Sequence, residues 1–179
     1  MELIVASLVS TTVLLGVGSL LVSYQTASVR LSKLNYVTTA TQATVTRIIN
    51  DATAAHGNSS DWAIRVGGSS GLSTSSFCLG TDTNTDDVND QWTCYTQITT
   101  NIYRCQQATI VNCTAAAPSV FIGTALAGTL TATNPSYDVT NNTFSITIIN
   151  RVDPSQAQSV NNPQYTASGS TSPISATNG

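Results

Sequence analysis

The feature that most constrains this chain is an uninterrupted apolar segment close to its N-terminus. Leu3 to Val22 are twenty consecutive positions without a charged side chain. A helix of that length is about 30 Å long and can cross the hydrocarbon core of a bilayer. A cleaved secretory signal is the alternative, but such signals open with a basic flank and end at a small-residue cleavage site. Because the flank here carries Glu2 and the segment is long, we expect an uncleaved membrane anchor.

The helical pattern continues beyond the apolar segment. Apolar and small side chains recur at steps of three or four residues, which is typical of an amphipathic helix. The first proline is Pro118, so no proline breaks this helix. Gly57 is the residue type that often follows a helix end, and His56 would be a favourable cation there. The sequence therefore predicts one helix from about residue 3 to 55. Its stripe consists of Leu31, Leu34, Thr38, Thr41, Val45, Ile48, Ala52 and Ala55.

Charged residues make up only 8% of the chain, against about 25% in average soluble proteins. The net charge is −3, and the six basic residues are scattered along the sequence. Nucleic-acid binding needs clustered lysine and arginine, so we expect no nucleic-acid partner. The chain has one histidine and none of the common catalytic motifs. We therefore do not expect an enzyme.

Beyond residue 60 the period of the apolar residues changes from 3.6 to 2, which indicates strands. Clusters of Gly, Asn, Asp and Ser separate these short runs, as expected for turns. The connections are too short for helical crossovers, which favours antiparallel pairing. The apolar face of such a sheet could pack on the stripe of the long helix. We therefore predict an α+β fold, with a long N-terminal helix packed on an antiparallel sheet. The expected strands are residues 62–66, 76–79, 91–98, 102–105, 119–122 and 143–149.

All four cysteines lie in the strand-rich region. They form no C-x-x-C pair and the single histidine is far away in sequence, so a zinc site is poorly supported. Two disulfides made in an oxidising compartment fit better. Three pairings exist. We favour Cys78–Cys94, which encloses one polar loop, together with Cys105–Cys113, which encloses a short one.

The densest cluster of charge lies between residues 82 and 90. Asp82, Asn84 and Asp86 match positions 1, 3 and 5 of an EF-hand loop. Position 6 of such a loop is glycine but is Asp87 here, and position 12 is glutamate but is Thr93 here. The loop is therefore not an EF-hand. Its carboxylates could still bind calcium, and a solvated acidic loop is the alternative. Beyond calcium we expect no cofactor. The candidate ligands are Asp82, Asn84, Asp86, Asp87 and Asp90.

Residues 154–179 form a polar tail that is rich in Ser, Asn, Gln, Pro and Thr and carries no charge. This composition is typical of a flexible or disordered segment, whereas an ordered tail would lie along a neighbouring surface or sheet edge. The chain thus divides into an N-terminal helix (1–56), a disulfide-bonded β-rich region (57–153) and the tail.

The start of the chain resembles a known family. Met-Glu-Leu-Ile-Val-Ala followed by an apolar helix is similar to the N-terminus of bacterial type IV pilins and of type II secretion pseudopilins. Processed chains of that family begin Phe-Thr-Leu-x-Glu-Leu. If Met1 stands at the x, Glu2 matches the family glutamate and three mature residues lie upstream; if Met1 is the mature start, the glutamate occupies an atypical second position. The resemblance covers residues 1–55. The globular part departs from the family, because classical pilins carry their disulfide near the C-terminus.

The resemblance implies a structural subunit of an extracellular filament on the bacterial surface. Before assembly, such a subunit is anchored in the inner membrane and is processed by prepilin peptidase. It then polymerises with identical subunits through the pilus assembly machinery. The resemblance also implies that Glu2 pairs with the N-terminal amine of a neighbouring subunit. A minor pilin or pseudopilin of a secretion system is one alternative. A membrane-anchored extracellular binding module that never polymerises is another.

Small residues within the apolar segment favour the filament, because they allow helices to pack closely. Gly16 and Gly18 lie at about the depth where many pilins have a proline. Glycine weakens a helix by about 1 kcal/mol relative to alanine, so any interruption of the helix in a filament is expected between Leu14 and Leu21. A continuous helix is the alternative. The small residues are Ala6, Ser7, Ser10, Gly16, Gly18 and Ser19.

Overall fold

The structure is a computed structural model that describes residues 2–57, 62–69, 71–84, 86, 88–116 and 118–175. The chain divides into two compact units, one that ends at Tyr36 and one that begins at Val37. This division lies inside the long helix and not at the change of composition near residue 56. The two units are therefore described separately.

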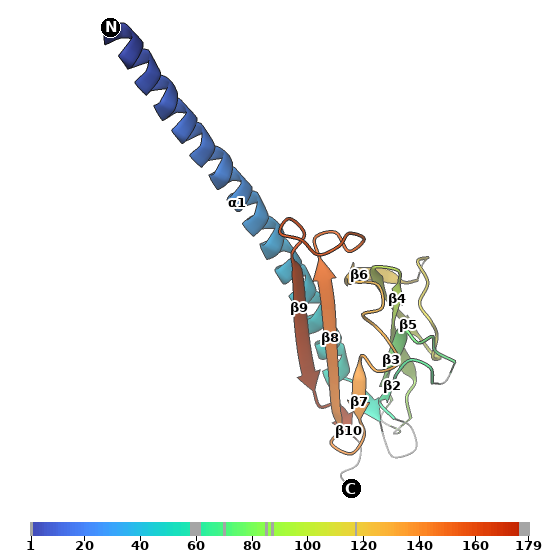
Figure 1. Cartoon of the computed structure of the whole chain (residues 1–179). Coiled ribbons are helices and arrows are strands. Elements are labelled where there is room, and N and C mark those ends of the chain that lie inside the picture. Colours follow the sequence, from blue (N-terminus) through green and yellow to red (C-terminus); the bar gives the residue numbers. More distant parts are fainter. Residues whose placement is uncertain are drawn as a thin grey trace. The chain divides into compact units, whose positions relative to one another are not determined.

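A single helix, α1 (Glu2–Thr53), forms the first unit and opens the second (Figure 1). The helix is the one predicted, but its end differs from the prediction. His56 and Gly57 form strand β1 (His56–Gly57), so Gly57 does not cap the helix. A Cβ added at Gly57 would lie 2.1 Å from the backbone nitrogen of Ala63. Glycine is needed at position 57 because two backbone segments approach closely there. The neighbouring His56 does not lie at the helix end, and its Nδ1 is 4.0 Å from Oδ2 of Asp82.

Two antiparallel sheets and one short parallel pair follow in the described residues (Figure 1). The predicted α+β class is confirmed, and each predicted strand overlaps an observed one. The five-stranded sheet has the order β2–β3–β4–β5–β6, and the three-stranded sheet has the order β7–β8–β9. Strand β1 pairs in parallel with β10. The remaining bounds are β2 (Ile64–Arg65), β3 (Ser76–Thr81), β4 (Gln91–Ile98), β5 (Asn101–Gln107), β6 (Val120–Thr124), β7 (Ser136–Asp138), β8 (Thr143–Arg151), β9 (Gln164–Thr171) and β10 (Ile174–Ser175).

The main core of the second unit lies between α1 and the sheets. On the helix, Ile48 and Ala52 are fully buried, and on the strands Phe77 and Tyr95 stack with ring centroids 4.8 Å apart. The predicted stripe is buried only in its C-terminal part. Leu31, in the first unit, is 60% exposed. Burial of one such large side chain contributes about 1.5–3 kcal/mol. The second half of α1 is therefore a core helix of the globular unit.

The polar tail contains strand β9, which pairs with β8 along its whole length. The composition left two possibilities open, a flexible tail or an ordered segment along a sheet edge. Strand β9 is the ordered segment at a sheet edge. Its small residues permit this, because a Cβ added at Gly169 would lie 2.7 Å from Cγ1 of Ile49 on α1. The preceding loop is organised by Asn162, whose amide accepts from the N–H of Asp153 at 2.9 Å and donates to the carbonyl oxygen of Asp153 at 3.0 Å.

Asp51, close to the C-terminal end of α1, links the helix to the five-stranded sheet. The hydroxyl of Tyr95 donates to Oδ2 of Asp51, and Nε of Arg104 donates to the same oxygen at 2.7 Å. Tyr95 and Arg104 face each other on β4 and β5. One carboxylate thus holds two neighbouring strands against the helix.

This linkage predicts a loss of stability at alkaline pH. Burial, reinforced by Asp51, raises the pKa of Tyr95 well above its ordinary value. Tyrosine in an unfolded chain ionises near pH 10, so Tyr95 adds no pH dependence at lower pH and costs stability as the pH rises above that value. We expect wild-type protein to lose stability more steeply than Tyr95→Phe between about pH 9 and about pH 11. Denaturant unfolding across this range measures the difference, and equal slopes would contradict it.

Candidate functional site: the apolar surface of the N-terminal helix

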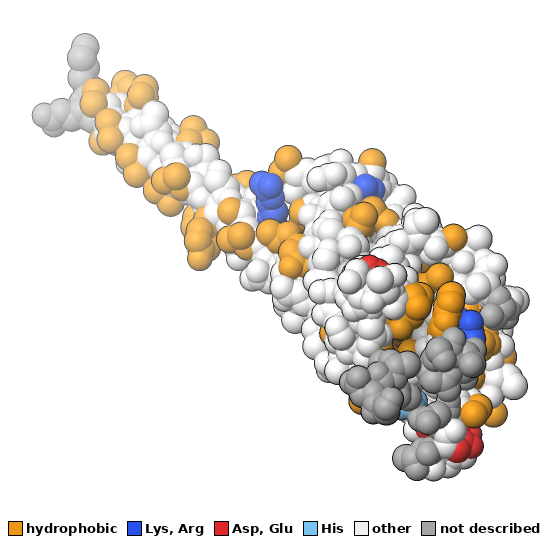
Figure 2. Space-filling model, turned by 90° about the horizontal axis from the view of Figure 1, so that it is seen from below, with side chains coloured by type: hydrophobic (Ala, Val, Ile, Leu, Met, Phe, Trp, Pro, Cys, Tyr) orange, Lys and Arg blue, Asp and Glu red, His pale blue; other side chains and the backbone are white. Residues whose placement is uncertain are grey.

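The candidate site is the surface of α1 in the first unit. Every residue from Ile4 to Lys33 is exposed within the chain, although this helix is long and apolar enough to cross a membrane. Leu14 and Leu15, for example, are 70% and 73% exposed. Figure 2 shows hydrophobic side chains along this helix and few charged ones on the visible face. An apolar surface of this extent needs lipid or protein to cover it.

Most hydroxyl groups within the apolar segment donate hydrogen bonds to the helix backbone. Ser7 donates to the carbonyl oxygen of Ile4 at 2.8 Å, and Thr12 donates to that of Val9 at 2.8 Å. Thr11, Ser19 and Thr26 make the same kind of bond one turn back. A polar group in a bilayer or in a helix bundle must find its partner internally. These serine and threonine residues therefore do not need water.

Gly16 and Gly18 lie within regular helix, and α1 has no interruption between Leu14 and Leu21 in this single chain. Apart from the adjacent residues and backbone of the helix itself, a Cβ added at either glycine would meet no described atom within 4 Å. Space inside the chain therefore gives no reason for glycine at these positions. Close approach of a neighbouring helix would give one. The interruption expected in a filament stays a prediction.

Glu2 is the first residue of α1, and its side chain lies outside the described residues. Its pairing with a neighbouring N-terminal amine stays a prediction from the family resemblance. Its place at the edge of an apolar segment is itself informative, because ionisable groups at membrane depth are costly and generally paired.

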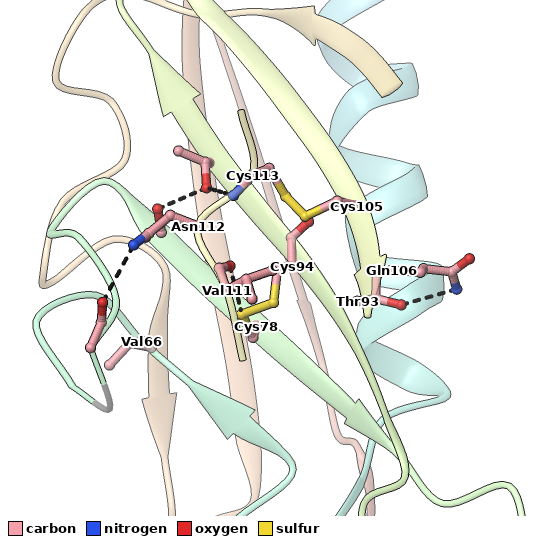
Figure 3. Close-up of a disulfide and its surroundings, with 12 residues drawn as sticks. Val66, Cys78, Thr93, Cys94, Cys105, Gln106, Val111, Asn112 and Cys113 are labelled. Atoms are coloured by element: carbon pink, nitrogen blue, oxygen red, sulfur yellow. Dashed lines mark hydrogen bonds between the residues drawn. A yellow bond between two sulfur atoms is a disulfide. The ribbon is translucent and has the colours of Figure 1, made fainter. Parts of the chain in front are cut away.

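The structure contains the favoured cysteine pairing, Cys78–Cys94 and Cys105–Cys113 (Figure 3). Cys94 faces Cys78 across one strand pair and Cys105 across the next. Together with Leu72 and Trp92 these cysteines form a second buried cluster. It lies on the face of the sheet opposite the main core, because neighbouring residues of a strand point to opposite faces. The second disulfide holds the loop that follows β5 over this face.

The acidic loop brings three of its predicted ligands together. Oxygen atoms of Asp82, Asp86 and Asp90 lie within 4.8 Å of one another. Calcium binds oxygen atoms at 2.3–2.6 Å, so this spacing fits one ion between the three carboxylates. The side chain of Asn84 instead donates to Asp86 at 3.1 Å, and Asp87 lies outside the described residues. Calcium binding therefore stays a prediction.

No protein-family model, curated protein or solved structure matches this chain. Function is therefore inferred from the chain's own residues. The apolar helix near the N-terminus indicates membrane anchoring or a signal peptide. The two disulfides indicate an extracellular location.

Proposed function

We propose that this chain is a structural subunit of an extracellular filament of the type IV pilus kind, assembled by packing of the N-terminal helices. The exposed apolar surface of α1 between Ile4 and Val22 carries this proposal. Lipid covers this surface while the subunit is in the inner membrane, and neighbouring helices cover it in the filament. Each large side chain covered in this way contributes about 1.5–3 kcal/mol relative to water. The same apolar surface is covered in the membrane and in the filament. The subunit can therefore pass from the membrane into the filament without exposing this surface to water in either state.

The helix is suited to a packed bundle in two further respects. The hydroxyls of Ser7, Thr11 and Thr12 bond to the helix backbone, so these groups are satisfied in a dry interior. Gly16 and Gly18 leave open space on the helix surface, which lets a neighbouring backbone approach closely. The low content of charge, 8% of residues, keeps repulsion between identical copies small.

Electron microscopy of sheared cell-surface material, with mass spectrometry of its main protein band, tests the proposal. A filament whose main band is this chain supports a major subunit. Filaments that contain only traces of the chain indicate a minor pilin or pseudopilin. If the chain is found only in the membrane fraction and sheared material lacks it, the proposal is wrong and a membrane-anchored binding module is the better description.

Replacing Glu2 with alanine is expected to abolish filament assembly while the disulfide-bonded unit stays folded. In the proposed filament the carboxylate pairs with the N-terminal amine of a neighbouring subunit, and removing one partner of a buried ion pair costs about 3–5 kcal/mol. Sheared filament yield and the amount of subunit in the membrane fraction are the two measurements. Glu2→Asp, which keeps the charge, is the matched control and should assemble better than Glu2→Ala. A normal yield from Glu2→Ala would rule out this role.

A further inference from the structure

Strand β9 is an edge strand without the usual protection. Natural proteins protect sheet edges by making the edge strand short or by placing charge or proline on it. Of the other sheet edges, β2 and β7 have two and three residues and contain Arg65 and Asp138, whereas β6 has five residues and no charge. Strand β9 has eight residues, QYTASGST, with no charge and no proline. It lies at the border of its sheet, beside α1 (Figure 1).

Hydrogen bonds on the far side of β8 show which backbone groups of β9 point outward. The side chain of Asn134 bonds to both the N–H and the C=O of Thr147, at 3.0 and 2.7 Å. The carbonyl oxygen of Ile149 accepts from the loop after β6 at 2.7 Å. Both residues therefore direct their backbone groups away from β9. Their partners across the strand pair are Ser168 and Thr166, which in an antiparallel ladder must direct theirs to the outer edge.

This outer edge is accessible. Ser168 and Thr166 are exposed, and no hydrogen bond between described residues uses their backbone N–H or C=O groups. A groove of about 350 Å³ lies along the strand, between β9 and residues such as Gln42 and Thr46 of α1. None of the described residues that line it is charged. The edge thus offers backbone donors and acceptors beside a neutral groove.

We propose that the outer edge of β9 binds an extended segment of a second copy of this chain, which adds a strand to the three-stranded sheet. Strand addition of this kind draws its affinity from backbone hydrogen bonds, and these are the groups that Thr166 and Ser168 present. The inference rests on the proposed function, because packing of the N-terminal helices would hold copies side by side at high effective concentration.

A second copy suits this site for two reasons. The groove and the edge are neutral, and this chain, with 8% charged residues, supplies extended segments that are neutral as well. Pairing of two β9 edges with each other would close a dimer, whereas pairing with a different segment of the neighbour leaves a further edge free and lets the polymer grow. A filament therefore requires that β9 of one copy pairs with a segment other than β9 in the next copy.

The test compares Ser168→Pro with Ser168→Thr in the full chain, expressed in cells. Proline removes the N–H that points outward, while the β8–β9 ladder keeps its bonds, since Ser168 does not donate to β8. We expect sheared filament yield to fall at least about tenfold for Ser168→Pro and to stay at the wild-type level for Ser168→Thr. The amount in the membrane fraction should match wild type for both variants. Thermal unfolding should match wild type for Ser168→Thr and stay close to it for Ser168→Pro, which loses only the exposed hydrogen bond between the hydroxyls of Ser168 and Thr147, 2.9 Å apart. Wild-type yield from a normally folded Ser168→Pro would overturn the proposal.

A photoreactive phenylalanine derivative in place of Ser168 gives a second measurement that does not depend on filaments. Irradiation of cells should give a covalent dimer of this chain, with the cross-link mapped to a segment other than β9. Absence of the dimer, or a cross-link between two β9 strands, would overturn the proposal. If wild-type cells make no filaments, the proposed function fails, and cross-linking of the membrane-bound subunit alone decides the role of this edge.

Discussion

Reduction of the two disulfides is expected to lower the free energy of unfolding of the second unit by about 5 kcal/mol. The bonds enclose segments with sequence separations of 16 and 8 residues, for which the chain-entropy model gives about 3 and about 2.5 kcal/mol. The first unit contains no cysteine, so its helix should persist. Denaturant unfolding of the full chain in detergent, with and without dithiothreitol, measures the change. Fluorescence of the buried Trp92 reports on the cluster around the cysteines.

Paired serine variants separate the two bonds. Cys105→Ser with Cys113→Ser should release the loop that follows β5 and expose it to protease, while the strands remain paired. Cys78→Ser with Cys94→Ser should cost more stability, because that bond closes the longer loop. In assembled material the strand-rich unit should become protease-sensitive before filaments come apart. Four free thiols in a non-reducing mass map of the native protein would refute the oxidised structure.

Replacing Asp51 with alanine is expected to destabilise the second unit by about 3 kcal/mol. The substitution removes the acceptor of Tyr95 and the ion partner of Arg104 together, and leaves a guanidinium whose side chain is only 17% exposed. Breaking a buried ion pair costs about 3–5 kcal/mol, and the 27% exposure of the Asp51 side chain places this case at the lower end. Equilibrium unfolding by circular dichroism measures the loss.

Asp51→Asn is the matched control, because the amide oxygen can still accept the hydrogen bond from Tyr95 while the charge is lost. Its stability should fall between those of wild type and Asp51→Ala. Adding Arg104→Met to Asp51→Ala should recover part of the loss, because an unpaired buried charge is then removed. If Asp51→Ala unfolds at the wild-type denaturant concentration, the carboxylate does not fasten the helix to the sheet.

The helix and most of the strands follow from local patterns. An apolar segment free of charge from Leu3 to Val22, followed by a stripe with helical spacing, can form only a long helix that buries its surface elsewhere. Each of the six predicted strands overlaps an observed strand, and β8 alternates between buried and half-buried residues along its whole length. Such patterns are local, because they reflect the geometry with which one helix or strand presents its side chains to an apolar surface.

The cysteine pairing was favoured from sequence but could not be decided by it. Cys78, Cys94 and Cys105 stand in one row across β3, β4 and β5. Cys94 therefore faces two cysteines, and only the position of the loop that carries Cys113 determines which bond forms. Loop position depends on contacts such as the N–H of Cys113 with Oγ1 of Thr96 at 2.9 Å. These contacts join residues distant in sequence, which no local spacing encodes.

Strand β9 and the contacts of Asp51 were decided by tertiary structure alone. The sequence of β9 is small and polar, typical of a flexible tail, and it forms a strand because Gly169 fits against Ile49 of α1 while β8 supplies a full ladder. In sequence, Asp51 cannot be told from a solvated charge on a helix surface. It links the helix to the sheet because β4 and β5 place Tyr95 and Arg104 within hydrogen-bonding distance of its carboxylate. Local sequence patterns thus identify the helix and most of the strands. Which polar groups meet depended on the packing of strands on the helix, because hydrogen bonds require partners placed to within a few tenths of an ångström.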